Sequence, residues 1–111
     1  MQETRQNKIA RLLQKELSII FREQTQNTHG VMVSVTRTKI SPDLSVCTAY
    51  LSIFPGEKAE EIMGNIRGAS KTIRYELGTR VRHQLRIIPE LRFFIDDSLD
   101  YMERIDKLLK G

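Results

Sequence analysis

Residues 64–74, GNIRGASKTIR, place small residues beside cations and come close to the phosphate-binding pattern G-x-x-x-x-G-K-[ST]. Gly64 fits the first position, but the second glycine and the lysine of that pattern fall on Ala69 and Ser70. Such a loop also follows a strand, whereas residues 57–63 have a helical pattern. The segment therefore argues against a nucleotide site and predicts a junction at which small residues adjoin positive charge.

Four acidic residues near the C-terminal end could hold a Mg²⁺ ion for phosphodiester chemistry, namely Asp96, Asp97, Asp100 and Glu103. They fit better the end of a strand followed by a capped helix, where the helix dipole stabilises carboxylates. His29 and His83 lie far apart, and neither has the spacing of a metal or catalytic motif. We therefore expect no enzyme activity, no metal and no cofactor.

Cys47 is the only cysteine, so neither an internal disulfide nor a multi-cysteine metal site is possible. It lies in SVCTAYLSI, which has the pattern of a strand, and we expect a buried and unreactive thiol. The charged residues are therefore the remaining functional candidates.

Positive charge is concentrated between residues 67 and 92, where the only acids are Glu76 and Glu90. At 100° per residue, several of these cations form one helical stripe beside an apolar one. This basic stripe consists of Arg67, Lys71, Arg74, Arg82 and Arg86, and Arg80 and Arg92 lie in the same segment. A solvated helix face usually pairs cations with acids four residues away, but Lys71 is followed by Tyr75 and Arg74 by Gly78. Gly78 occupies the vacant position, so nothing bulky should interrupt the stripe.

Arginine predominates in the basic stripe, which favours bidentate contact with phosphates. The small residues Ala69 and Ser70 would let a sugar–phosphate chain approach the helix backbone closely. These features favour a nucleic-acid backbone as the ligand. An acidic protein partner and a lipid surface remain as alternatives.

The length of 111 residues predicts a single domain over residues 1–111. The hydrophobic fraction of 40% suffices for a core, which the absence of Trp makes largely aliphatic. A net charge of +4 is not specific by itself. The N-terminal segment has no apolar signal region, and no run approaches the roughly 20 residues that cross a bilayer. We therefore expect a cytoplasmic protein without a membrane partner.

The hydrophobic pattern predicts the elements that position these charges. Apolar residues three and four apart predict a helix over residues 4–24. Alternating segments at 31–40 and 46–54 predict two antiparallel strands. A helical pattern from about 58 to 85, broken by small residues from 64 to 70, predicts two helices that meet at a kink.

A third strand is expected over residues 87–97, where Leu91, Phe93 and Ile95 should share one face. Ser98 can cap a short last helix. The order α-β-β-α-kink-α-β-α predicts a layered α+β domain.

With these elements in order, nearly the whole chain resembles the bacterial ribosome-binding factor A family. The matching segments are RQNKIARLLQKELSIIFRE, ISPDLSVCTAYLSIF, GASKTIRYELGTRVRHQLRIIPEL and RFFIDDSLDYMERIDKLL. The most specific is the order LR-IIPEL-RF-DDS across residues 85–98. The resemblance implies a KH-like fold of the type II order α-β-β-α-kink-α-β, followed here by a short C-terminal helix.

The resemblance also implies a non-enzymatic assembly factor that binds the small (30S) ribosomal subunit and its ribosomal RNA during late maturation. Ribosome biogenesis, rRNA processing, growth in the cold and release by a GTPase belong to the same implication. Where KH domains carry a G-x-x-G loop, the family has an Ala-x-Gly kink, which matches Ala69, Ser70 and Lys71 here. Lysine in place of the glycine would restrict the kink while it adds a phosphate contact.

We therefore predict a monomeric RNA-binding domain whose contacts to phosphate and sugar read RNA shape more than sequence. The predicted RNA-binding residues are Arg67, Ala69, Ser70, Lys71, Arg74, Arg80, Arg82 and Arg86. A second group, which could equally be a solvated face, consists of Arg5, Lys8, Arg11 and Lys15. A basic module that docks an acidic protein partner without RNA is the alternative.

Overall fold

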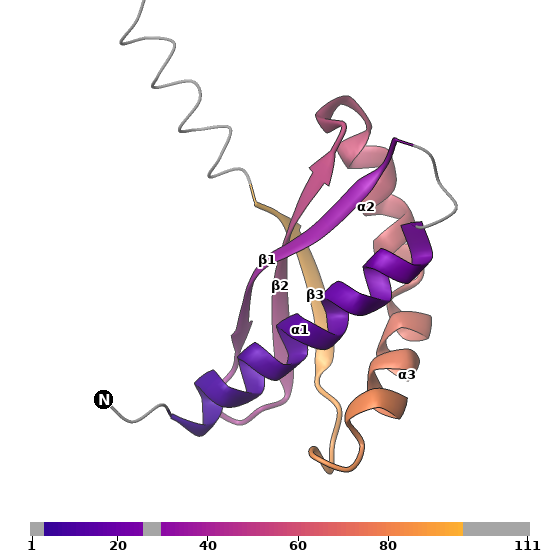
Figure 1. Cartoon of the computed structure of the whole chain (residues 1–111). Coiled ribbons are helices and arrows are strands. Elements are labelled where there is room, and N and C mark those ends of the chain that lie inside the picture. Colours follow the sequence, from indigo (N-terminus) through magenta and orange to yellow (C-terminus); the bar gives the residue numbers. More distant parts are fainter. Residues whose placement is uncertain (1–3, 26–29, 97–111) are drawn as a thin grey trace, which may run out of the picture.

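A computed structural model describes residues 4–25 and 30–96, whose arrangement is shown in Figure 1. The elements are α1 (Arg5–Thr25), β1 (Met32–Ile40), β2 (Val46–Phe54), a 3-10 turn η1 (Gly56–Lys58), α2 (Ala59–Gly68), α3 (Ser70–Val81) and β3 (Glu90–Ile95). The α+β order predicted from the sequence is confirmed over these residues. The predicted C-terminal helix lies outside the described residues.

Helix α1 begins directly after Thr4, whose hydroxyl accepts a 3.1 Å hydrogen bond from the N–H of Asn7 and so caps the helix. Its apolar stripe is buried, as the spacing predicted, and consists of Ile9, Leu13, Leu17, Ile20 and Phe21. The helix packs on the sheet along β1. Its cationic face is thereby left to solvent.

Over the described ranges, the sheet has three strands in the order β1-β2-β3. Strands β1 and β2 pair antiparallel, as expected. Strand β3 pairs with β2 in parallel, because the α2–α3 crossover returns the chain to the opposite end of the sheet. In β3, Leu91 and Phe93 are buried as predicted, but Ile95 at the end of the strand is 37% exposed.

Strand β1 contains a β-bulge between Val35 and Arg37. Val35 faces the core before the bulge and Ile40 faces it afterwards, so the alternation shifts by one residue at Thr36. Arg37 and Lys39 consequently lie on the outer face of the sheet, away from the core. An unbroken alternation would have turned both cations inward.

Helices α2 and α3 meet at Ala69, which confirms the predicted kink. The N–H of Ala69 donates to the carbonyl oxygens of Asn65 at 3.0 Å and Ile66 at 3.1 Å, and the helical ladder resumes when the N–H of Ile73 bonds Ala69 at 2.9 Å. Ala69 has φ −98° and ψ 11°, which an L-residue adopts without glycine. Lys71 is the second residue of α3 and lies in regular helix, next to the kink rather than in it.

Helix α3 ends at Val81, before the end predicted near residue 85. The N–H groups of Gln84 and Leu85 both bond the carbonyl oxygen of Val81, at 2.8 and 2.9 Å, and this turn redirects the chain toward β3. Arg86 follows the turn. The basic stripe is therefore not one continuous helical face, because the tight turn at Val81 separates Arg86 from α3.

Buried apolar residues from α1, α2, α3 and the strands β1, β2 and β3 form one cluster between the helical layer and the sheet. This cluster fixes the helices against one side of the sheet. No helix of the described ranges is long and apolar enough to cross a membrane.

Candidate nucleic-acid interface

A shallow hollow of about 640 Å³ opens on the outer side of α3. It is lined by Lys71, Arg74, Tyr75, Gly78, Thr79, Arg82 and Ile88. The side chains of Lys71 and Arg82 are exposed, and Tyr75 between them is 74% exposed. The α3 hollow thus brings together three residues of the basic stripe around one aromatic ring, with no acid in its lining.

Gly78 determines how the floor of the α3 hollow is built. A Cβ at this position would lie 3.3 Å from Cγ1 of Ile88, so the glycine lets Ile88 pack closely on α3. Ile88 thereby fills the vacant position of the basic stripe. The expectation that nothing bulky interrupts the stripe is wrong, because a residue from another segment occupies the gap.

Arg74 is not the unpartnered charge that its sequence neighbours suggested. Its Nε donates to the carbonyl oxygen of Pro89 at 3.2 Å, and its Nη2 donates to that of Ile88 at 2.7 Å. These two carbonyl oxygens take the place of an acidic side chain, which is absent four residues along the helix, at Gly78. Arg74 therefore holds the segment that enters β3 against α3, besides lining the hollow.

Arg67 points toward strand β3 rather than into the α3 hollow. Its Nε and Nη2 donate to the carbonyl oxygen of Phe93, at 3.2 and 2.9 Å, and its guanidinium carbon lies 5.8 Å from the centroid of the Phe94 ring. A second hollow of about 280 Å³ lies here, lined by Arg67, Ser70, Leu91, Arg92, Phe93 and Phe94. Ser70 of the kink therefore faces the β3 edge.

Arg80 and Arg86 lie apart from both hollows. Arg80 forms ion pairs with Glu16 at 3.4 Å and Glu23 at 3.0 Å, which link α3 to α1 and compensate its charge. Arg86 lines a third hollow of about 260 Å³ that also includes Arg5 from the start of α1. The predicted RNA-binding residues are thus distributed over several places rather than along one stripe.

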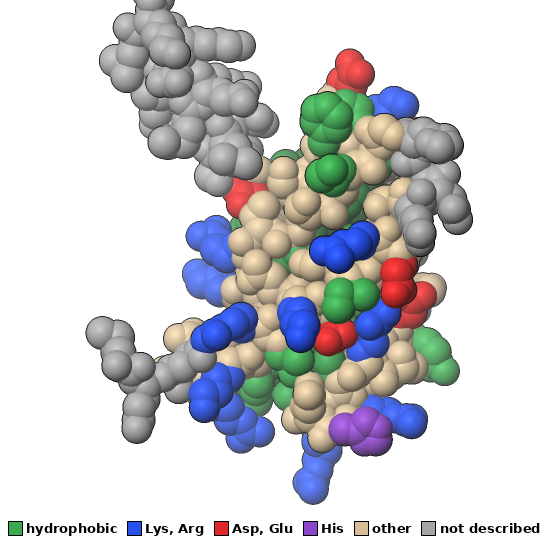
Figure 2. Space-filling model, in the orientation of Figure 1, with side chains coloured by type: hydrophobic (Ala, Val, Ile, Leu, Met, Phe, Trp, Pro, Cys, Tyr) green, Lys and Arg blue, Asp and Glu red, His purple; other side chains and the backbone are tan. Residues whose placement is uncertain are grey.

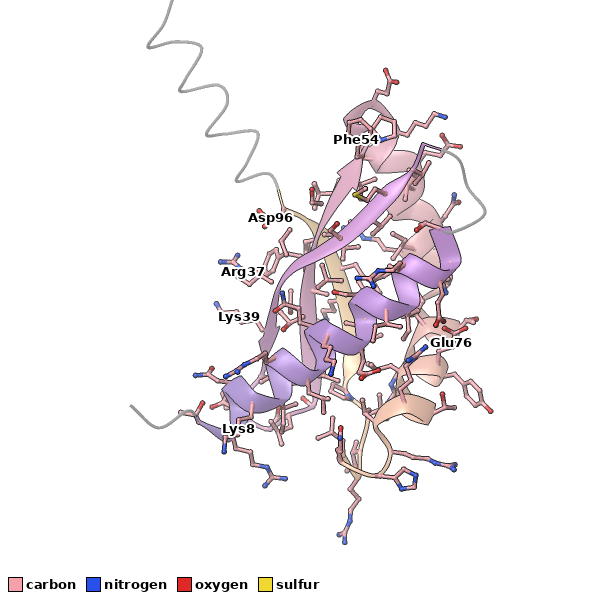
Figure 3. The ribbon with its side chains drawn as sticks, in the orientation of Figure 1. Lys8, Arg37, Lys39, Phe54, Glu76 and Asp96 are labelled. Carbon is pink, nitrogen blue, oxygen red and sulfur yellow. The ribbon has the colours of Figure 1, made fainter. Side chains whose placement is uncertain are left out.

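The second predicted group, Arg5, Lys8, Arg11 and Lys15, is exposed along α1. Figure 2 shows Lys and Arg side chains gathered at the lower left, over the N-terminal half of α1 and the adjacent sheet. Glu16 and Glu23 of the same helix turn toward Arg80 instead. Figure 3 shows Lys8 projecting from the start of α1.

The outer face of the sheet carries a group of residues that the sequence did not single out. The guanidinium carbon of Arg37 lies 4.3 Å from the centroid of the Tyr50 ring, and that ring lies 6.2 Å from the ring of Phe94. Three different strands supply these side chains. Only the strand register and the bulge at Thr36 could have revealed the group, and neither is visible in local periodicity.

Cys47, Asp43 and Asp96 are engaged in the structure of the protein. Cys47 is fully buried, and desolvation raises the pKa of its thiol to about 12, in agreement with the predicted buried thiol. Asp43 in the β1–β2 turn accepts hydrogen bonds from Ser45 and Ser41, and these bonds hold the pKa of its carboxyl below the ordinary value. Asp96 accepts a hydrogen bond from the hydroxyl of Thr36.

Metal-binding geometry is not found in the described ranges. No three His, Cys, Asp or Glu residues among residues 4–25 and 30–96 come together in a way that could hold an ion. Of the four acids considered for Mg²⁺, only Asp96 belongs to those ranges, and Asp97, Asp100 and Glu103 lie outside them.

The helix–kink–helix, the parallel return of β3 beside β2 and the one-sided helical layer define a KH-like α+β domain. The chain belongs to the ribosome-binding factor A family, whose family model matches residues 5–109. It is 45% identical to ribosome-binding factor A of Flavobacterium johnsoniae over 113 aligned positions, which cover 100% of this chain and 87% of the relative. The protein of the same name from Christiangramia forsetii is 42% identical, with the same coverage.

Solved structures show the same fold. The crystal structure of ribosome-binding factor A from Thermus thermophilus superposes with a TM-score of 0.67 at 22% identity, covering 83% of this chain and 97% of that one. A homology model of the Thermus thermophilus protein, fitted into the cryo-EM map of a 30S–RbfA complex, gives 0.64 at 23% identity, covering 79% and 91%. These similarities confirm the KH-like fold class that the family resemblance implied.

Proposed function

We propose that this chain is a non-enzymatic ribosome assembly factor that binds the small ribosomal subunit and its ribosomal RNA during late maturation. Membership of the ribosome-binding factor A family over residues 5–109 carries the proposal. The Thermus thermophilus relative in a 30S complex supports the choice of subunit. Roles in rRNA processing and cold adaptation, release by a ribosome-assembly GTPase, and action as a cytoplasmic monomer complete the proposal.

The α3 hollow supports RNA as the direct ligand. Lys71 and Arg82 are exposed cations at its rim, and no acid among the described residues pairs with either. Phosphate oxygens would satisfy them at little desolvation cost, and Tyr75 offers an exposed ring for stacking. Such contacts position an RNA backbone without reading a sequence, as expected for recognition of RNA shape.

Co-sedimentation with isolated small subunits and with whole ribosomes tests this function. We expect preference for isolated small subunits, and we expect the double variant Lys71→Ala/Arg82→Ala to bind more weakly. Both truncated side chains are exposed to solvent and neither is part of the core, so the melting temperature should not change. Lys58→Ala is the matched control, because Lys58 is an exposed cation in η1, outside the three hollows described above. Arg74 is unsuitable as a probe because its loss would also disturb the Ile88–Pro89 segment.

Salt dependence separates RNA from an acidic or apolar protein partner. Each phosphate neutralised contributes a log–log slope of roughly −0.7 to −0.9, so the double variant should flatten the slope by about 1.4 to 1.8. Equal affinity of wild type and double variant would overturn the α3 hollow as the binding surface. A flat salt response of the wild type, with binding that survives ribonuclease treatment of the subunit, would favour a protein partner.

A further inference from the structure

A row of three side chains crosses the outer face of the sheet. The strand register places Arg37 of β1 opposite Tyr50 of β2, and Tyr50 opposite Phe94 of β3. The Arg37 guanidinium carbon is 4.3 Å from the centroid of Tyr50, and the rings of Tyr50 and Phe94 are 6.2 Å apart with an interplanar angle of 33°. A cation and two aromatic rings therefore form one continuous surface across all three strands.

A second row lies two residues along the strands, about 7 Å away. Its members are Lys39, Thr48 and Arg92, which the register places opposite one another in the same order. Figure 3 shows Arg37 and Lys39 projecting from β1 on the side of the view opposite Glu76 and helix α3. The stacking surface, defined as these two rows, is thus separate from the α3 hollow.

The charges around the stacking surface favour an anion. Arg67 reaches Phe94 from α2, at 5.8 Å from the ring centroid, and adds to the cations of the two rows. Among the residues that the structure describes, the nearby acids are Glu90, which lies 3.7 Å from Arg92, and Asp96, which accepts a hydrogen bond from Thr36. Both acids are therefore already engaged within the protein, and the cations exceed them in number.

The β-bulge is the structural cause of this surface. The hydroxyl of Thr36 donates to the carbonyl oxygen of Tyr50 at 3.2 Å and also to Asp96, which fixes the extra residue of β1. Because the bulge shifts the alternation, Arg37 emerges beside the Tyr50 ring. Core packing does not account for the aromatic row, since Phe94 is 45% exposed.

We propose that the stacking surface is a second RNA-binding surface, which takes unpaired bases of single-stranded RNA. Bases would stack on the Phe94 ring and on the Arg37 guanidinium that covers Tyr50, while Lys39 and Arg92 contact the flanking phosphates. The sheet is about 10 Å wide between its outer strands, which accommodates one or two bases. The inference rests on the proposed function for RNA as the ligand and assigns it a surface away from the α3 hollow.

A second copy of this chain fits the stacking surface less well than RNA. Two such faces brought together would oppose Arg37, Lys39 and Arg92 to their own counterparts, and like charges destabilise an interface. A polyanion with flat aromatic bases matches both the cations and the exposed rings. The cations and the exposed rings together therefore favour single-stranded RNA as the occupant.

The test measures binding of a fluorescein-labelled single-stranded oligo(A) of about eight nucleotides, a length within the range of single-strand sites. We expect Phe94→Leu and Arg37→Gln each to weaken this binding about tenfold, and to leave binding of a duplex RNA of equal length unchanged, because paired bases cannot unstack onto the sheet. Phe54→Leu is the matched control. Phe54 is a 66% exposed aromatic of β2 whose register partner is Met32 rather than a cation.

Tyrosine fluorescence adds a direct readout, since the chain has no Trp. Oligo(A) should quench the emission of the wild type. Measured in a Tyr75→Phe background, which removes the exposed tyrosine of the α3 hollow, Tyr50→Phe keeps the ring at position 50, so it should retain the affinity and lose most of the quenching. Wild-type affinity in both Phe94→Leu and Arg37→Gln would overturn the proposal, as would an equal loss in Phe54→Leu.

Two further measurements separate the possible failures. A dimer in sedimentation velocity that Phe94→Leu dissociates would assign the face to a second copy instead. Co-sedimentation of the wild type with small subunits is measured in parallel. Failure of the wild type to co-sediment would overturn the proposed function, whereas subunit binding together with wild-type oligo(A) affinity in both Phe94→Leu and Arg37→Gln would overturn the stacking surface alone.

Discussion

Nη2 of Arg74 donates a 2.7 Å hydrogen bond to the carbonyl oxygen of Ile88. With the bond from Nε to Pro89, this contact joins α3 to the segment that leads into β3. It also places the Ile88 side chain against Gly78, and so forms the floor of the α3 hollow. Arg74 thus shapes the hollow that Lys71 and Arg82 also line.

Arg74→Ala should destabilise the domain, whereas Arg82→Ala should not. The first variant leaves two carbonyl oxygens without their charged donor, which we expect to lower the free energy of unfolding by about 1–2 kcal/mol, given that the site is partly exposed. The second removes an exposed side chain and should stay within about 0.5 kcal/mol of the wild type. Urea denaturation measures both. Equal stability of the two variants would contradict the bracing role of Arg74.

The ion pairs of Arg80 should contribute to stability rather than to subunit binding. A double-mutant cycle with Arg80→Ala and Glu16→Ala should give a coupling of about 0.5–1 kcal/mol, because both side chains are only partly exposed, at 31% and 17%. The coupling should shrink in 1 M salt. Arg80→Ala should co-sediment with small subunits like the wild type. A loss of binding at full stability would instead restore Arg80 to the interface.

Local periodicity was sufficient to predict the helices and strands of residues 4–25 and 30–96, because each of these elements buries one face and exposes the other. The alternation of Cys47, Ala49 and Leu51 on one side of β2 is an example, and all three are buried. The bulge at Thr36 could not be predicted, since a single inserted residue leaves both halves of β1 with a regular pattern. The KH-like class came from the resemblance to a family rather than from periodicity.

The partners of the cations were also beyond local reasoning. Helical spacing predicts neighbours three or four residues away, but Arg80 pairs with Glu23 across 57 positions of sequence. Arg74 bonds backbone carbonyls, which every residue carries and which no sequence pattern marks. The sequence therefore predicted some of the residues that line the α3 hollow, namely Lys71, Arg74 and Arg82. It did not predict that Arg74 bonds backbone carbonyls while Arg82 stays exposed.

Replacement of two glycines by alanine should change the stability of the protein in opposite directions. Gly64 lies inside α2, and a Cβ there would meet nothing within 4 Å, so Gly64→Ala should stabilise the protein by up to about 1 kcal/mol through helix propensity. Gly30 has φ +78°, in the left-handed region, so Gly30→Ala should destabilise it by about 1 kcal/mol. Thermal denaturation compares the pair. Destabilisation by Gly64→Ala would show that α2 needs the glycine for a reason other than backbone freedom.

Cys47 should make the protein less stable at alkaline pH. Burial raises the pKa of its thiol to about 12 from an ordinary value of 9.0, so between these values the folded chain keeps a proton that the unfolded chain releases. The neutral thiol's contribution is fully present below pH 9.0 and is lost as the pH rises toward 12. Cys47→Ala should reduce this decline between about pH 9 and 10.5 in urea denaturation. A thiol reagent at about pH 8 should modify the wild type only after unfolding, and rapid modification of the folded chain would contradict the burial of Cys47.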